Sequence, residues 1–375
     1  MIPSFINNFS SIERQNKVLE RTRYMMENAN YVLAGETEMF ELEFSEKFAP
    51  NKRCKSVANA TIALELIFLF YLEKVKKSKK IAIPTNTNFA TVASALRAGW
   101  EVYLIDCDSR DLNASYESFL DLLNEVPDLS ALCLVHIGGV VTRDLTKFVK
   151  TCEQNEILLF EDCAHAVGSF HNGSSAGSFG AASAFSFFPT KPLGVTEGGI
   201  VMTGDIELIN FVESMRNQGK RGTKFGNLHE DFGGSWRMNE FSAIMCNVLM
   251  PEINQILSER FLEATKMFSV TSRFASSNFP DHMKRWSVYK YFILPSDIEH
   301  CGRLKQALAE KNIKPSGAVY ERPIHKQPVF EGVINTPISL NNSEYFCPLQ
   351  IVLPVPQTPH PEYLEVLEST LRETQ

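Results

Sequence analysis

Short apolar runs alternate with helical patterns through the first two thirds of this 375-residue chain. Each run is long enough for one buried strand, and the runs lie at 80–84, 101–106, 130–136, 156–162, 182–188 and 199–203. The spacing of apolar positions between them predicts helices at 60–77, 88–98, 115–126, 144–154 and 205–217. Strands separated by helices of this length form mainly parallel sheets that are covered on both faces. We therefore predict an α/β fold with a mainly parallel sheet.

The pattern changes after a helix expected near 239–257. A segment rich in Ser and Phe (268–280) precedes a strand-like run at 288–294, a helix at 302–311 and a closing helix at 361–373. The length of the chain is ample for two domains. We expect a large domain over residues 1–250 and a smaller C-terminal α+β domain over residues 251–375.

Composition narrows the class of protein. The net charge is −7, and the densest basic cluster, KVKKSKK (74–80), is better explained by a solvated helix end than by nucleic-acid binding. The N-terminus lacks the pattern of a secretory signal, and the most apolar stretch (61–72) is too short to cross a bilayer. Eight scattered cysteines contain no CxxC pair, so no disulfide framework or zinc site is implied. We expect a cytoplasmic protein that binds neither nucleic acid nor membrane.

The most informative segment runs from Glu161 to Gly199. Asp162 ends one apolar run, and Ser186 and Lys191 lie at the end of the next. Pyridoxal phosphate (PLP) needs a lysine for a Schiff base, a carboxylate for its pyridine nitrogen, and hydroxyl or N–H donors for its phosphate. Lys191, Asp162 and Ser186 match these needs, although a lone lysine in a turn is usually solvated and Asp162 also suits a helix N-cap.

For the other candidate cofactor-binding residues, a purely structural role is a comparable explanation. His165 is placed to orient the carboxylate or to contact a ring oxygen of the cofactor, and a hydrogen-bonded core histidine explains it equally well. Phe89 is a candidate for stacking on the pyridine ring, but with 27 phenylalanines in the chain a core position is the more common explanation. Asn59, Ala60 and Thr61 precede an apolar helix, whose N-terminus suits either an anion or a simple cap by Asn59.

The segment from Glu161 resembles the DegT/DnrJ/EryC1/StrS aminotransferases, which are PLP enzymes that aminate keto sugars. Further matches follow in order over roughly residues 30–370. They are GETEMFELEFSEKFA (35–49), NATIALEL (59–66), PTNTNFATVASALRAG (84–99), VHIGG (135–139), GGSWRMNEFSAI (233–244), VYERPIHKQPVF (319–330) and LPVPQTP (353–359). An ordered series of this kind is far more specific than any single motif.

The resemblance implies fold type I, with a mainly parallel sheet of the seven-stranded type in the large domain. It also implies a homodimer whose active sites lie at the subunit interface. It also implies an aldimine on Lys191, a pyridinium contact at Asp162 and a phosphate contact at Ser186. The expected reaction moves an amino group, usually from glutamate, to a keto sugar, and the best match is a nucleotide-linked 4-keto-6-deoxy sugar. Dehydratase relatives carry histidine at the Schiff-base position, so Lys191 favours transamination. A cyclitol ketone or other non-nucleotide acceptor, and a non-catalytic regulatory role, are the remaining alternatives.

Two segments depart from the family pattern. Asn59-Ala60-Thr61 replaces SGT, and the loss of glycine removes the freest backbone conformation near the phosphate. In GGSWRM, Ser235 stands where the family commonly has an asparagine that reaches the cofactor phosphate of the partner subunit. The resemblance further implies that Arg237, Tyr320 and His325 bind substrate. Arg237 suits an anion because guanidinium groups bind phosphate bidentately.

Overall fold

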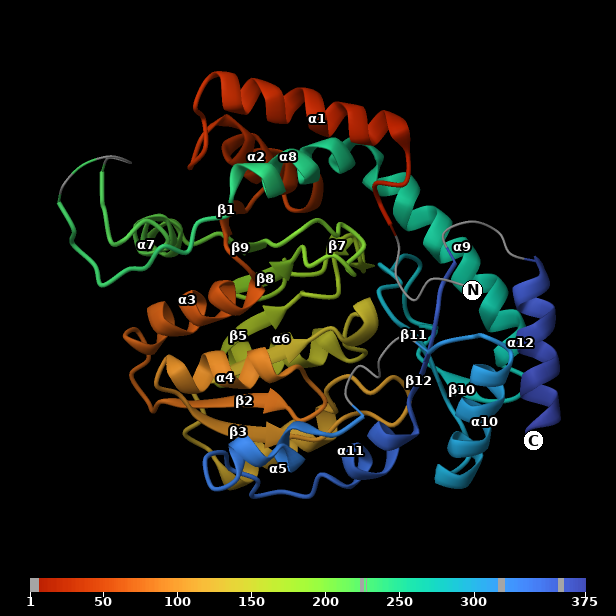
Figure 1. Cartoon of the computed structure of the whole chain (residues 1–375). Helices are drawn as coiled ribbons and strands as arrows, with labels where there is room; N and C mark the ends of the chain where they lie inside the picture. The colour runs from red at the N-terminus through yellow and green to blue at the C-terminus, as the bar shows by residue number, and fades with distance from the viewer. Residues whose placement is uncertain (1–6, 223–225, 227, 316–320, 357–360) are drawn as a thin grey trace.

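The centre of the molecule is a seven-stranded sheet (Figure 1). Its strands are β1 (Arg53–Val57), β2 (Lys80–Pro84), β3 (Glu101–Ile105), β4 (Ala131–Val135), β5 (Leu158–Asp162), β8 (Ala182–Ser186) and β9 (Gly199–Thr203), in the spatial order β1-β9-β8-β5-β4-β2-β3. β9 is antiparallel to both of its neighbours, and the other six strands point in one direction. The predicted mainly parallel sheet is confirmed. The computed structural model describes residues 7–222, 226, 228–315, 321–356 and 361–375.

Helices cover both faces of this sheet because its strands are apolar on both sides. Ile81 and Ile83 of β2 face one core, whereas Ala82 between them faces the other. The first core includes α3 (Ala60–Leu72), α4 (Phe89–Arg97) and α7 (Ile206–Met215). The second includes α2 (Gly35–Phe48), α5 (Tyr116–Glu125), α6 (Leu145–Gln154) and α8 (Glu240–Leu249). On the outside of α8 lies α1 (Ile12–Glu27), which the apolar pattern did not predict.

A smaller antiparallel sheet follows in the C-terminal part of the chain. It contains β10 (Ser276–Ser277), β11 (Tyr291–Leu294) and β12 (Ile351–Leu353), with α9 (Ile253–Thr271), α10 (Ile298–Glu310) and α12 (Pro361–Glu373) beside it. Side chains of both sheets, such as Leu134 and Ile293, belong to one continuous apolar cluster. The two-domain division at residue 250 stays a prediction. Short elements complete the described part of the chain: β6 (Phe170–His171), β7 (Ser174–Ser175), α11 (Asn341–Phe346), and the 3-10 turns Ile137–Gly139, Met250–Glu252, Ile324–Lys326, Pro328–Phe330 and Cys347–Leu349.

Part of the C-terminal region returns to the edge of the large sheet. The Asn335 N–H donates to the Val102 carbonyl oxygen beside β3 (2.9 Å), and the Ser343 N–H donates to the Asp106 carboxylate (2.8 Å). These contacts cover an edge strand that would otherwise expose unpaired backbone groups. Among the described residues, none of the helices combines the length and the apolar character that crossing a membrane requires.

Two glycines after β4 allow residues 287–290 to approach the large sheet closely. Gly138 and Gly139 have φ angles of +67° and +93°, which side chains rarely adopt. A Cβ atom on Gly139 would overlap the Ser287 hydroxyl and lie 2.8 Å from the His165 carbonyl oxygen. On the other side, the Lys290 N–H donates to the Gly138 carbonyl oxygen (3.1 Å). The predicted strand at 288–294 therefore begins only at Tyr291, because residues 287–290 bond to these loops instead.

Replacing Gly139 by alanine tests this close approach. We expect Gly139→Ala to lower the free energy of unfolding by about 3 kcal/mol or more, because backbone strain and overpacking add. The control is Gly173→Ala, where φ is also positive (+81°) but the added Cβ meets nothing within 4 Å. Strain alone predicts a loss of about 1–2 kcal/mol there. Urea denaturation measures both, and equal losses in the two variants would contradict the packing.

Candidate active site

A cavity of about 440 Å³ lies at the carboxyl ends of β5 and β8. Parallel strands commonly deliver ligand-binding groups to such an edge, and the volume falls within the roughly 300–1,000 Å³ that is usual for small-molecule sites. Seven of the residues predicted from the sequence line this cavity: Asn59, Ala60, Thr61, Asp162, His165, Ser186 and Lys191.

Lys191 lies in the loop after β8 and is buried there. Its backbone N–H donates to the Phe188 carbonyl oxygen (2.8 Å), and the Asn8 amide donates to the Pro192 carbonyl oxygen (3.1 Å), so the turn is fixed from two sides. Burial lowers the pKa of the Lys191 amine to about 7; the Asp162 carboxylate opposes this shift and the charge of Lys290 adds to it. Close to half of the amine is thus neutral at pH 7, which is the form that attacks carbonyl groups.

Asp162 is the last residue of β5, and both of its carboxylate oxygens have hydrogen-bond partners. The Thr91 hydroxyl donates to Oδ2 (2.8 Å), and the Ala164 N–H donates to Oδ1 (3.0 Å). Burial raises the pKa of Asp162, while these two hydrogen bonds and the charge of Lys191 act in the opposite direction. A cation that enters the cavity will therefore stabilise the ionised carboxylate.

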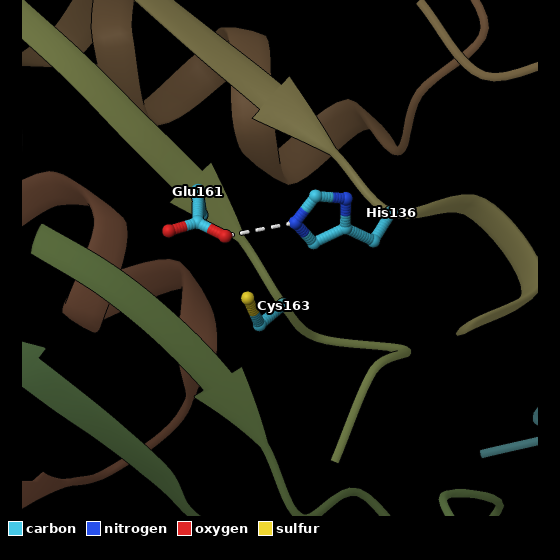
Figure 2. Close-up of side chains that lie close together, drawn as sticks. All are labelled: His136, Glu161 and Cys163. Atoms are coloured by element: carbon cyan, nitrogen blue, oxygen red, sulfur yellow. Dashed lines mark hydrogen bonds and ion pairs between the residues drawn. The ribbon is translucent and has the colours of Figure 1, made fainter. Parts of the chain in front are cut away.

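Glu161, the residue before Asp162 in β5, forms hydrogen bonds on the other side of the sheet. Figure 2 shows His136, Glu161 and Cys163 close together and fully buried. The Thr142 N–H donates to His136 Nδ1 (3.2 Å), so the ring proton is on Nε2, which donates to Glu161 (3.0 Å). Glu161 also accepts three backbone N–H bonds of 2.8 Å, from Gly177, Phe179 and Gly180.

The hydrogen bonds around His136, Glu161 and Cys163 indicate a structural role for these three residues. Burial alone would raise the pKa of Glu161, but the bond from His136 and those from the backbone bring it below its usual value. Burial also raises the pKa of the Cys163 thiol well above its usual value, so the sulfur is protonated. The ring proton and the carboxylate lone pairs that a metal ion would need are already in use. The trio thus fixes the end of β5 and the loop at 177–180.

The opposite wall of the cavity suits a phosphate. Asn59 caps α3 by accepting the Ile62 N–H (3.0 Å), and the N–H groups of Ala60 and Thr61 in the first turn have no carbonyl partner within the helix. Ser186, at the end of β8, adds a hydroxyl. Asn59 is extended (φ −167°) and Ala60 is helical, so this segment needs no glycine. The replacement of SGT therefore leaves the backbone of the anion site intact.

His165 lines the cavity as a neutral imidazole. The Gly138 N–H donates to its Nδ1 atom (3.2 Å), so the ring proton is on Nε2. Burial, and then the charges of Lys191 and Lys290, lower the pKa of His165 well below its usual value. The ring also contacts Tyr289, with 4.3 Å between the ring centroids. A neutral imidazole N–H of this kind suits a hydrogen bond to the ring oxygen of the cofactor better than it suits the transfer of charge to Asp162.

The stacking role of Phe89 stays a prediction. Phe89 begins α4, and its half-exposed ring packs against Phe330 with 5.4 Å between the ring centroids. Its neighbours Asn88 and Ala90 line the cavity, but Phe89 does not. Asn88 is the N-cap of α4, and its side chain accepts the Ala90 N–H (2.9 Å).

The other predicted residues lie outside the cavity of their own chain or outside the described residues. Arg237 donates to the Ser235 hydroxyl and to the Asn217 side chain (3.0 Å). His325 shares a hydrogen bond with the Thr85 hydroxyl (2.6 Å) and another with Glu344 (3.0 Å). Tyr320 is not among the described residues.

Several residues of the cavity were not predicted from the sequence, and Tyr289 and Lys290 are two of them. The run VYKYFIL reads as one strand, and the only signal against this was a lysine in its middle. Tyr289 exchanges a hydrogen bond with the Thr190 hydroxyl (2.9 Å), and its ring centroid lies 4.2 Å from Lys191 Nζ. Lys290 is mostly buried, and burial together with the charge of Arg260 lowers its pKa to about 8.

Comparison with known proteins decides the family. The model of the DegT/DnrJ/EryC1/StrS aminotransferase family matches residues 13–370. The chain belongs to this family. The predicted membership, fold type I and dependence on pyridoxal phosphate are confirmed.

Individual relatives are more distant. GDP-perosamine synthase of Vibrio cholerae is 28% identical over 224 residues, which cover 60% of this chain and 59% of that protein. The aminotransferase PseC of Helicobacter pylori, involved in the biosynthesis of pseudoaminic acid, has a TM-score of 0.89 at 21% identity, covering 100% of this chain and 98% of that one. An Escherichia coli GDP-4-keto-6-deoxy-D-mannose-3-dehydratase with bound hydrated PLP has a TM-score of 0.88 at 18% identity, covering 99% of each chain.

The residues of the cavity fit the cofactor. A buried carboxylate, a buried amine of nearly neutral pKa and a helix N-terminus with a hydroxyl beside it surround one space. These are the groups that the ring nitrogen, the aldehyde and the phosphate of PLP require. When bound, PLP supplies an aldehyde that captures amines and a ring that accepts electron density from the substrate.

The pH dependence of cofactor capture tests the environment of Lys191. Only the neutral amine attacks the aldehyde, so we expect the rate at which the apoprotein gains visible absorbance from PLP to rise with pH, with a midpoint near 7. Lys191→Met should gain no such absorbance at any pH. A midpoint near the ordinary lysine pKa of about 10.4 would contradict the desolvation of this amine.

Proposed function

We propose that this chain is an aminotransferase that moves an amino group from an amino acid, with glutamate as the expected donor, to a keto sugar. The observation that carries the proposal is a buried lysine of nearly neutral pKa in the same cavity as a buried carboxylate. A nucleotide-linked 4-keto-6-deoxy sugar is the proposed acceptor. Relatives named as GDP-perosamine synthase and as dTDP-3-amino-sugar transaminases support a nucleotide-linked sugar, whereas the position of the ketone at C4 stays a prediction.

Each residue then has a role in this reaction. Lys191 captures the cofactor and afterwards moves a proton to and from the substrate carbon. Asp162 holds the ring nitrogen, and Thr91 keeps the Asp162 carboxylate in place. His165 donates a hydrogen bond from Nε2 to the ring oxygen. Ser186 and the first turn of α3 bind the phosphate.

The half-reaction with glutamate tests this function. We expect the PLP form of the protein to release one 2-oxoglutarate per chain from glutamate while its visible absorbance is lost. Lys191→Met should slow this step by about 10²–10⁴-fold or more, because the amine that moves the proton is removed. Lys147→Met, at an exposed position on α6, is the matched control and should react as the natural protein does. Failure to form an oxo acid from glutamate or any other amino acid would refute transamination and favour a non-catalytic role.

Labelled donor separates the alternatives that remain. With nitrogen-labelled glutamate, transamination places the label in the sugar product, whereas a dehydratase forms a deoxy product without the label. Lysine at position 191 supports the first outcome, since dehydratase relatives carry histidine there. A panel of keto sugars and cyclitol ketones, assayed by consumption of the amine form, identifies the acceptor class.

We also propose a homodimer with shared active sites. Residues 217–222 and 228–235 form an arm that projects from the body beside α7 (Figure 1). The arm carries Phe232, which is fully exposed, and Leu228, which is 67% exposed. Ser235 and Arg237, at its base, lie outside the cavity of their own chain. A second subunit would cover the Phe232 and Leu228 side chains. In such a dimer, Ser235 and Arg237 would lie at the active site of the second subunit. The cytoplasmic location stays a prediction.

Complementation tests the shared site. Lys191→Met and Arg237→Ala should each lower the activity strongly when expressed alone. In dimers formed by co-expression, half of the molecules are mixed and half of their sites are complete, so about a quarter of the natural activity should return. Recovery no greater than the sum of the two separate variants would show that each subunit completes its own site.

A further inference from the structure

Lys290 is the second lysine of the catalytic cavity, and the fold holds it there. Among the described residues that line the cavity, Lys191 and Lys290 are the cations. The Lys290 N–H donates to the Gly138 carbonyl oxygen (3.1 Å), and its own carbonyl oxygen accepts from the Asn278 amide (2.8 Å). The buried Arg260 donates to the carbonyl oxygens of Ser287 (3.3 Å) and Val288. Backbone bonds thus fix this segment on both sides.

The two lysines share one aromatic neighbour. The Tyr289 ring centroid lies 4.2 Å from Lys191 Nζ and 5.1 Å from Lys290 Nζ. Tyr289 itself is held by its hydrogen bond with Thr190, one residue before Lys191. Lys290 therefore adds a second positive charge to the cavity that holds the reacting amine, and both amines lie against the same tyrosine ring.

The chemistry of the donor indicates which anion meets this charge. In an amino acid, the α-carboxylate is bonded to the same carbon as the amine that reacts beside Lys191, so it must lie within a few ångströms of that point. The phosphates of a nucleotide sugar are separated from the keto carbon by several bonds of the sugar ring. A cation next to Lys191 is placed for the carboxylate, and burial from water strengthens the attraction.

We propose that Lys290 is a specificity-determining residue that binds the α-carboxylate of the amino donor. This inference rests on the proposed aminotransferase function and adds to it the group that recognises the donor. Because every amino acid has an α-carboxylate, Lys290 selects for amino acids as a class and not for glutamate over alanine.

Binding of 2-oxoglutarate to the PLP form tests the proposal without turnover, because an oxo acid has no amine to react. We expect Lys290→Met to weaken its binding, measured by calorimetry, by about tenfold or more. Lys290→Arg should restore most of the affinity, since the charge returns. Lys284→Met, at an exposed lysine of the same region, is the matched control and should bind as the natural protein does. Pyruvate, which has only the carboxylate next to the reacting carbon, should lose a similar factor.

Each other outcome overturns the proposal in a recognisable way. Unchanged 2-oxoglutarate binding in a folded Lys290→Met variant removes Lys290 from donor recognition and leaves the aminotransferase function intact. Loss of GDP binding with 2-oxoglutarate binding retained assigns the charge to a phosphate instead. If the natural protein neither binds 2-oxoglutarate nor reacts with glutamate or alanine, both this inference and the proposed function fail. A melting temperature for each variant identifies any that does not fold.

Discussion

Removal of Lys191 and Asp162 from water is the constraint on which the site depends. Burial alone shifts both groups toward their neutral forms, lowering the pKa of the amine and raising that of the acid. For the amine this is useful, because the neutral form is the nucleophile. For the acid it is opposed by fixed hydrogen bonds from Thr91 and Ala164, which keep the carboxylate ready for a cationic ring nitrogen. The same cavity thus suits a neutral Lys191 amine and an ionised Asp162 carboxylate.

The fold achieves this by joining loops that are far apart in the sequence. The buried Glu161 carboxylate accepts hydrogen bonds from the loop at 177–180 and from the His136 ring. These bonds fix the end of β5. Gly138 and Gly139 leave room for residues 287–290, which form the wall opposite the large sheet. The polar contacts that position the site therefore mostly join a side chain outside the cavity lining to a backbone group, so they remain when a side chain in the cavity is replaced.

The sequence was most informative where burial repeats along the chain. The strands at 80–84 and 199–203 have the predicted bounds because their apolar runs end at polar or turn residues. β1 (RCKSV) was missed because it has few apolar residues and pairs with β9, far along the chain. α1 was missed because only a narrow apolar stripe contacts α8. In the site, residues at strand ends could be predicted, whereas Lys290 depends on a contact with the loop after β4 that has no local signal.

The most direct test of the account is the location of the cofactor on the chain. Reduction of the PLP-loaded protein with borohydride, followed by peptide mass mapping, identifies the lysine that holds it. The account predicts the pyridoxyl group on Lys191, with Lys290 unmodified, because the charge of Asp162 acts on the Lys191 amine and Lys191 has the lower pKa of the two. A pyridoxyl group on Lys290, or on neither lysine, would contradict it.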